Sequence, residues 1–121
     1  MINWQLHNGF ERDFKKLAKK QCGLEEGFAV LKKLLNRQFD SECPVAVIAP
    51  GKIHHIKTDD LGWEIWKVEM MVKGLRPNQW PRVWFAVKGD TITFLAIGSH
   101  VDNYENNEMD ALAEERYGEV E

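Results

Sequence analysis

The sequence predicts an α+β domain: an N-terminal strand, an αα-hairpin, and a mainly antiparallel sheet of three to four strands with helices on one face. A short C-terminal helix follows the sheet. Two observations predict this class. Apolar residues recur at helical spacing over residues 10–39, and β-rich runs separated by short turns fill residues 52–98. Because each helix is apolar on one side only, both need a sheet to lie against.

The first third of the chain predicts one strand and two helices. Residues 2–6 alternate apolar and polar side chains, as a half-buried strand does. We expect Asn8 to cap the first helix, with Glu11 completing a capping box. Gly23 is expected to end that helix, and a second one follows over residues 24–39.

The remaining elements are strands followed by one helix. We expect strands over residues 52–57, 64–72, 82–87 and 91–98. The last two are joined by Lys88-Gly89-Asp90, which is a turn signal for a hairpin. In that hairpin, residue 82 lies opposite residue 97. Residues 106–117 can form the final short helix.

Composition indicates one ordinary domain. The chain has 121 residues, of which 44% are hydrophobic and 29% are charged, a balance typical of a soluble globular protein. Apolar runs are far too short to span a membrane, and no secretory signal is visible. Cys22 and Cys43 are too few for a disulfide framework, so we expect free thiols and a cytoplasmic protein.

Charge divides the chain into two parts. Residues 1–104 carry 15 basic and 12 acidic side chains, whereas residues 105–121 carry one basic and seven acidic side chains. We therefore expect a mildly basic domain over residues 1–104. Residues 105–121 form an acidic extension, expected as a short helix on or beside the domain. This extension is either a solvated end or a segment that partly shields the basic surface.

Motifs for several kinds of enzyme are absent. The sequence has no glycine-rich phosphate loop, no dinucleotide fingerprint, no Cys-x-x-Cys pair and no Gly-x-Ser-x-Gly elbow. His54 and His55 are neighbours on a predicted strand, so they should point to opposite sides, one buried and one exposed. We expect neither a metal ion nor a cofactor.

Polar residues gather at the end of the last predicted strand. His100, Asp102 and Tyr104 follow it directly, where a sheet can present side chains to a ligand. A histidine can exchange a proton near neutral pH, and an arginine suits phosphate. The cations expected near this end of the sheet are Arg82, Lys67 and Lys73. Together these residues indicate a site for a phosphodiester.

Residues 2–104 resemble the RelE/ParE superfamily of bacterial toxins, in the order of a strand, a helical hairpin and a sheet. The segment GSHVDNY is similar to the Gly-Thr-His-Ser-Asp-Leu-Phe signature of the YafQ branch, which matches His100, Asp102 and Tyr104 to its histidine, acidic and aromatic positions. RVWFAV resembles a RelE strand that carries a phosphate-stabilising arginine, here Arg82. Lys67 falls where RelE has the first of two alternating lysines.

The resemblance implies a toxin of a type II toxin–antitoxin system that cleaves messenger RNA on the ribosome. The 2′-hydroxyl of the RNA would attack, without a metal ion. His100 would act as acid or base, Arg82 would stabilise charge, and Tyr104 would stack or relay a proton. Lys67, Lys73 and Asp102 would bind substrate. A cognate antitoxin is the implied partner, and the oligomeric state stays open.

Two alternatives remain open on the sequence. One is a ParE-like inhibitor of DNA gyrase without a catalytic centre. It is favoured by Glu69 at the second RelE lysine position and by the small excess of basic over acidic side chains in residues 1–104. The other is an inactive relative that only binds proteins. Each site residue also has a plain structural interpretation, such as a solvated strand lysine for Lys67. Most of the five tryptophans are expected in the core or an interface.

Overall fold

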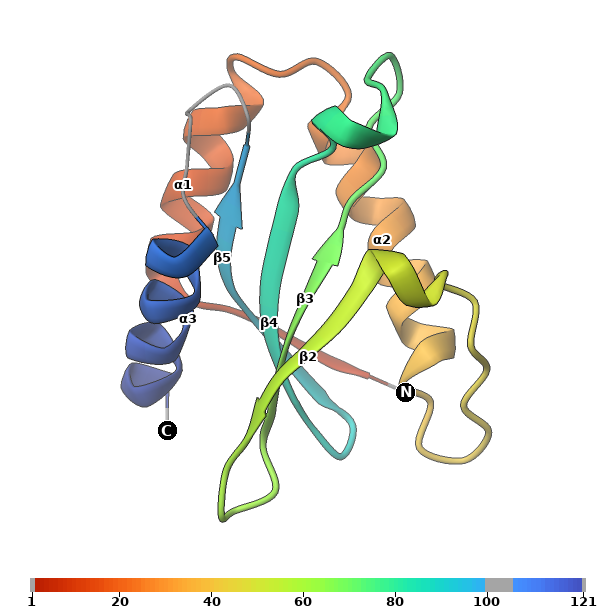
Figure 1. The fold of residues 1–121 in the computed structure, drawn as a ribbon, viewed down its shortest axis with the longest axis vertical. Helices are drawn as coiled ribbons and strands as arrows, with labels where there is room; N and C mark the ends of the chain where they lie inside the picture. Colours follow the sequence, from red (N-terminus) through yellow and green to blue (C-terminus); the bar gives the residue numbers. More distant parts are fainter. Residues whose placement is uncertain (1, 100–105, 121) are drawn as a thin grey trace.

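The computed structural model describes residues 2–99 and 106–120 (Figure 1). The elements, in chain order, are β1 (Asn3–Leu6), α1 (Asn8–Ala18), α2 (Leu24–Gln38), a 3₁₀ turn (Pro50–Lys52), β2 (Ile53–Thr58), β3 (Glu64–Glu69), a second 3₁₀ turn (Pro77–Gln79), β4 (Arg82–Lys88), β5 (Thr91–Gly98) and α3 (Asn106–Val120). The predicted α+β class is confirmed, including the final helix.

All the strands join one mixed sheet in the order β1-β5-β4-β3-β2. Strands β2 to β5 pair antiparallel with their neighbours in sequence, as the short turns predict. Strand β1 pairs parallel with β5, which places the N-terminal strand at one edge. Strand β2 forms the other edge.

Helices cover both faces of the sheet. The two helices of the hairpin share one face, as predicted, and the final helix, expected on or beside the domain, takes the other face. Helices α1 and α2 pack against one face of the sheet, and α3, which is drawn in front of α1 in Figure 1, packs against the other. Side chains alternate along a strand, so Phe85 packs in the core beneath α1 and α2, while Trp84 packs against Ala113 and Tyr117 of α3. The second face therefore carries a smaller apolar core of its own.

The start of α1 differs from the sequence prediction. His7 is the N-cap residue, and its Nδ1 accepts a hydrogen bond of 2.9 Å from the backbone N–H of Gly9. Asn8 is already inside the helix, and Glu11 pairs with Lys15 at 3.4 Å. The predicted capping box was wrong because an imidazole nitrogen satisfies the helix end in place of an asparagine oxygen.

Helix α1 ends at Ala18, earlier than predicted, and Gly23 is the N-cap of α2. Its φ of 85° lies in the left-handed region that glycine adopts readily. This residue therefore turns the chain from one helix into the next.

A β-bulge between Trp84 and Phe85 sets the register of the last hairpin. Arg82 pairs with Gly98, one residue beyond the predicted partner at position 97. The bulge shifts the pairing by one residue. As a result, the chain leaves β5 directly beside Arg82.

Gly27 allows the segment after β3 to lie close to α2. A Cβ added at Gly27 would lie 2.6 Å from the carbonyl oxygen of Met71, which is backbone and cannot swing away. Gly118, on α3, has nothing within 4 Å of such a Cβ. Only the first of these two helical glycines is required by packing.

We predict that Gly27→Ala lowers the free energy of unfolding by about 1–3 kcal/mol, because the added methyl group overpacks the helix–sheet contact. Gly118→Ala is the matched control and should raise it by about 0.5–1 kcal/mol, through helix propensity alone. Urea unfolding followed by circular dichroism measures both. Equal effects of the two substitutions would contradict the close approach.

Candidate functional site

The candidate site is an open hollow of about 520 Å³ on the face of the sheet that carries α3. Its lining comes from three strands and one helix. The lining residues are His54, His55, Ile56, Lys67, Arg82 and Asp110. We call this set the basic hollow, because Lys67 and Arg82 both line it.

Strand pairing explains why the cations lie together. Lys67 pairs with His54 on one side and with Trp84 on the other. Arg82 lies two residues before Trp84 and therefore projects to the same face. The two positive groups come from adjacent strands on one face, close enough to line a common space.

Helix α3 supplies a carboxylate to the same space. Asp110 Oδ1 accepts a hydrogen bond of 2.7 Å from the indole Nε1 of Trp84, a side chain that is completely buried. The same oxygen lies 3.9 Å from Lys67 Nζ. Asp110 thus satisfies a buried donor of the sheet and also places a negative charge beside one of the two cations.

Contacts on its C-terminal half fasten α3 to the domain. The buried guanidinium of Arg116 donates 2.9 Å hydrogen bonds to the backbone oxygen of Leu95 and to Asp13 on α1. Tyr117 donates its hydroxyl hydrogen to Asp59 in the β2–β3 turn. Helix α3 is therefore a fixed wall of the basic hollow, and its loss would uncover Trp84 and Leu95.

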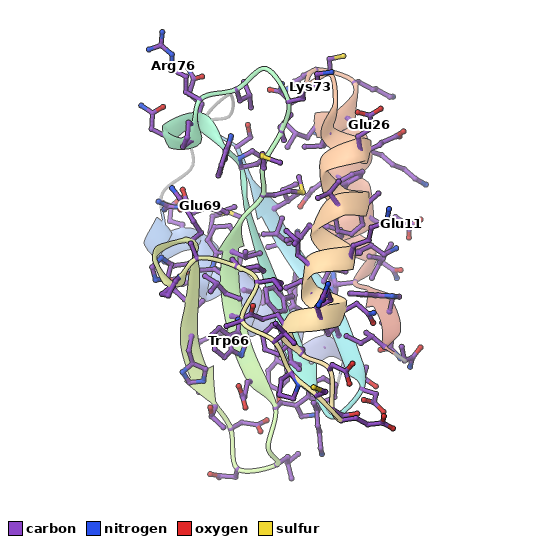
Figure 2. All side chains as sticks on the ribbon, turned by 90° about the vertical axis from the view of Figure 1, so that its right-hand side faces the viewer. Glu11, Glu26, Trp66, Glu69, Lys73 and Arg76 are labelled. Carbon is purple, nitrogen blue, oxygen red and sulfur yellow. The ribbon has the colours of Figure 1, made fainter. Side chains whose placement is uncertain are left out.

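The structure brings together some of the residues expected at the site. Lys67 and Arg82 line the hollow, whereas Lys73 does not. Figure 2 shows Lys73 beyond Glu69, near the end of the molecule that carries Arg76. The carbonyl of Lys73 faces Gly23 at the start of α2.

The other three expected site residues, His100, Asp102 and Tyr104, lie outside the described residues. The chain that precedes them is described. Gly98 pairs with Arg82 at the end of β5, and the next residue, Ser99, is buried.

Two histidines of the hollow were not expected there. His54 and His55 are both exposed, which corrects the expectation that one would be buried. Both are among the residues that line the hollow. His54 pairs with Lys67, whereas His55 pairs with Trp66, which packs against the core beneath α1 and α2. His55 also forms a 2.7 Å hydrogen bond with Thr58 and an edge-on contact with Trp66.

Asp110 was also missed. The sequence signal available for it was only the acidic bias of residues 105–121, which does not single out one carboxylate. Within residues 2–99 and 106–120, no three His, Cys, Asp or Glu side chains gather in a way that could hold a metal ion. None of the described helices is long and apolar enough to cross a membrane.

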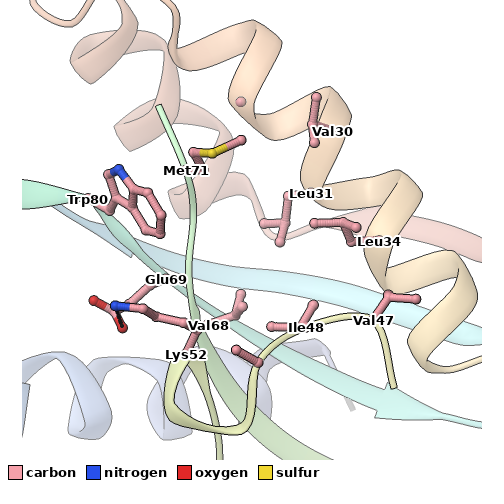
Figure 3. A pocket seen from close by; sticks show the side chains of 12 residues that line it. Val30, Leu31, Leu34, Val47, Ile48, Lys52, Val68, Glu69, Met71 and Trp80 are labelled. Carbon is pink, nitrogen blue, oxygen red and sulfur yellow. Dashed lines mark ion pairs between the residues drawn. The ribbon is translucent and has the colours of Figure 1, made fainter. Parts of the chain in front are cut away.

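A second hollow, of about 190 Å³, lies between α2 and β3 (Figure 3). Its walls are mainly apolar, with the partly exposed Val30 and Met71 on its rim. Its charged residues are Lys52 and Glu69, which pair with each other at 3.5 Å. This hollow holds one cation and one carboxylate, whereas the basic hollow holds two cations and one carboxylate. We therefore take the basic hollow as the candidate site for chemistry.

The Trp84–Asp110 contact generates a stability prediction. Asp110→Ala leaves the buried indole N–H of Trp84 without its acceptor, which should lower the free energy of unfolding by about 1–3 kcal/mol. Asp110→Asn keeps a carbonyl oxygen at the same place and should cost clearly less. Denaturant unfolding monitored by tryptophan fluorescence compares them, and equal losses would refute the role of the hydrogen bond.

Comparison with known proteins gives one structural likeness. No protein-family model matches the chain, and no curated protein matches it. Among solved structures, the chain is similar to a copper-bound mutant toxin from Helicobacter pylori, at 22% identity and a TM-score of 0.45. The match covers 86% of this chain and 100% of that one.

Proposed function

We propose that the protein is the toxin of a type II toxin–antitoxin system and cleaves messenger RNA at the basic hollow, as its resemblance to the RelE/ParE superfamily implies. The observation that carries the proposal is the meeting of Lys67 and Arg82 from adjacent strands in one open hollow. Two cations on a rigid sheet can hold a phosphate from two sides.

The register of β5 supports a contribution from the segment that follows it. Because Gly98 pairs with Arg82, the chain that continues toward His100 starts at the side of this arginine. We assign His100 as the acid or base that moves a proton to or from the RNA, and Tyr104 as a stacking or proton-relay group. Asp102 lies between them in the sequence.

The proposed reaction needs no group from outside the protein and the RNA. A base removes the proton of the 2′-hydroxyl, whose oxygen then attacks the neighbouring phosphorus. The bond to the 5′-oxygen breaks, and an acid protonates that leaving oxygen. Arg82 and Lys67 stabilise the additional negative charge on the phosphorus oxygens.

The position of Glu69 bears on the choice between nuclease and gyrase inhibitor. Glu69 is the cross-strand partner of Arg82, but its carboxylate pairs with Lys52 and is absent from the lining of the basic hollow, so Lys52 offsets part of its repulsion of a phosphate. Asp110 favours the alternative, since it brings a negative charge into the hollow. A ParE-like inhibitor of DNA gyrase is therefore the second candidate.

Either candidate implies an antitoxin as partner, and a cytoplasmic location. We expect a small reading frame beside the gene to encode it. Co-expression of that product should restore growth to cells that express this protein. A genome without such a neighbour would count against both toxin candidates.

Expression in bacteria tests the nuclease. The wild-type protein should halt translation, and His100→Ala and Arg82→Ala should each weaken the effect strongly, because acid–base and charge-stabilising groups each contribute about 10²-fold or more. Lys33→Ala removes an exposed lysine of α2 and is the matched control. Pulse labelling of new protein gives the readout.

The same experiment separates the alternatives. DNA-damage signalling that persists in His100→Ala would establish the gyrase inhibitor instead. A wild-type protein that leaves growth and translation unchanged would reject both toxin candidates.

A further inference from the structure

We propose that Asp110 competes with the RNA phosphate for Lys67. Its carboxylate pairs with Lys67 in the free protein and so weakens RNA binding. This inference deepens the proposed function and rests on it. It gives α3 a role in setting the affinity of the site, which no feature of the strands alone would indicate.

The distances around Asp110 favour competition. The 3.9 Å between Asp110 Oδ1 and Lys67 Nζ is an ion-pair distance but exceeds a hydrogen bond. The hydrogen bond of that oxygen goes to Trp84 Nε1 instead, at 2.7 Å. The carboxylate therefore offsets the charge of Lys67 without forming a hydrogen bond to it. The ammonium hydrogens of Lys67 can still be donated to another acceptor.

The exposure of Lys67 and Asp110 also favours competition between the carboxylate and a phosphate. The side chain of Lys67 is 20% exposed and that of Asp110 is 32% exposed, so both groups reach the open space of the hollow. A phosphate that approaches Lys67 there comes close to the carboxylate. Repulsion between the two anions opposes binding, while the attraction of Arg82 favours it.

Asp110 cannot easily move aside when RNA arrives. Arg116 and Tyr117 fasten the following turns of α3, and the indole of Trp84 holds Asp110 itself. The carboxylate therefore acts as a permanent feature of the site. Its negative charge lowers the affinity of the site for a phosphate.

Asp110→Asn isolates the charge. Asparagine keeps an oxygen that can accept from Trp84, so the fold and the wall of the hollow are retained, while the competing charge is lost. Glu114→Gln makes the same change one turn further along α3, where Glu114 lies 3.8 Å from Lys57 outside the hollow. It is the matched control for the overall charge of the helix.

The test measures binding of a short, fluorescently labelled oligouridine to the purified full-length variants by anisotropy. Asp110→Asn should bind about two- to fivefold more tightly than the wild type, as removal of one partly exposed charge interaction predicts. Glu114→Gln should differ by less than twofold. Unchanged or weaker binding by Asp110→Asn, or an equal gain by Glu114→Gln, would overturn the competitor role.

Lys67→Met tests whether Asp110 acts through Lys67. Lys67→Met alone should weaken binding, and Asp110→Asn should then give much less gain in the Lys67→Met background than in the wild type. A full gain in that background would overturn the inference while leaving the proposed function intact. Binding that neither Lys67→Met nor Arg82→Met weakens would instead refute the proposed function.

Discussion

The hydrogen bond between the buried indole of Trp84 and Asp110 is the contact on which the second face of the sheet depends. Trp84 is too large to remain uncovered, and its N–H needs an acceptor once α3 excludes water. Asp110 provides that acceptor from the helix. The requirement of one tryptophan thus brings a carboxylate to the side of Lys67.

The two faces of the sheet have different roles. The face beneath α1 and α2 is filled by large apolar side chains, among them Phe10, Phe85 and Phe94, which stack and tilt against one another. The face beneath α3 is covered over β4 and β5 and left open toward β2. Rigidity on the first face allows the second to hold charged groups in fixed positions.

Much of the fold could be predicted from periodicity, because helices and strands repeat their apolar residues at different spacings. The strand boundaries of β4 and β5 followed from the turn between them. The register did not, since nothing in the sequence marks the bulge after Trp84. The face taken by α3 did not follow from the sequence. Met109, Leu112, Ala113 and Tyr117 lie at helical spacing and need a surface to pack on, but their pattern does not say which face of the sheet they meet.

The site was predictable to the extent that neighbouring strands create it. Lys67 and Arg82 share a face by simple alternation, whereas Asp110 joins them only through tertiary packing of a distant helix.

The central claim is that RNA binds in this hollow, and backbone amide NMR during titration with a short single-stranded RNA tests it most directly. The account predicts the largest shifts at Lys67, Arg82 and Asp110. Shifts confined to the apolar hollow around Met71 and Trp80, with those three amides unchanged, would contradict it.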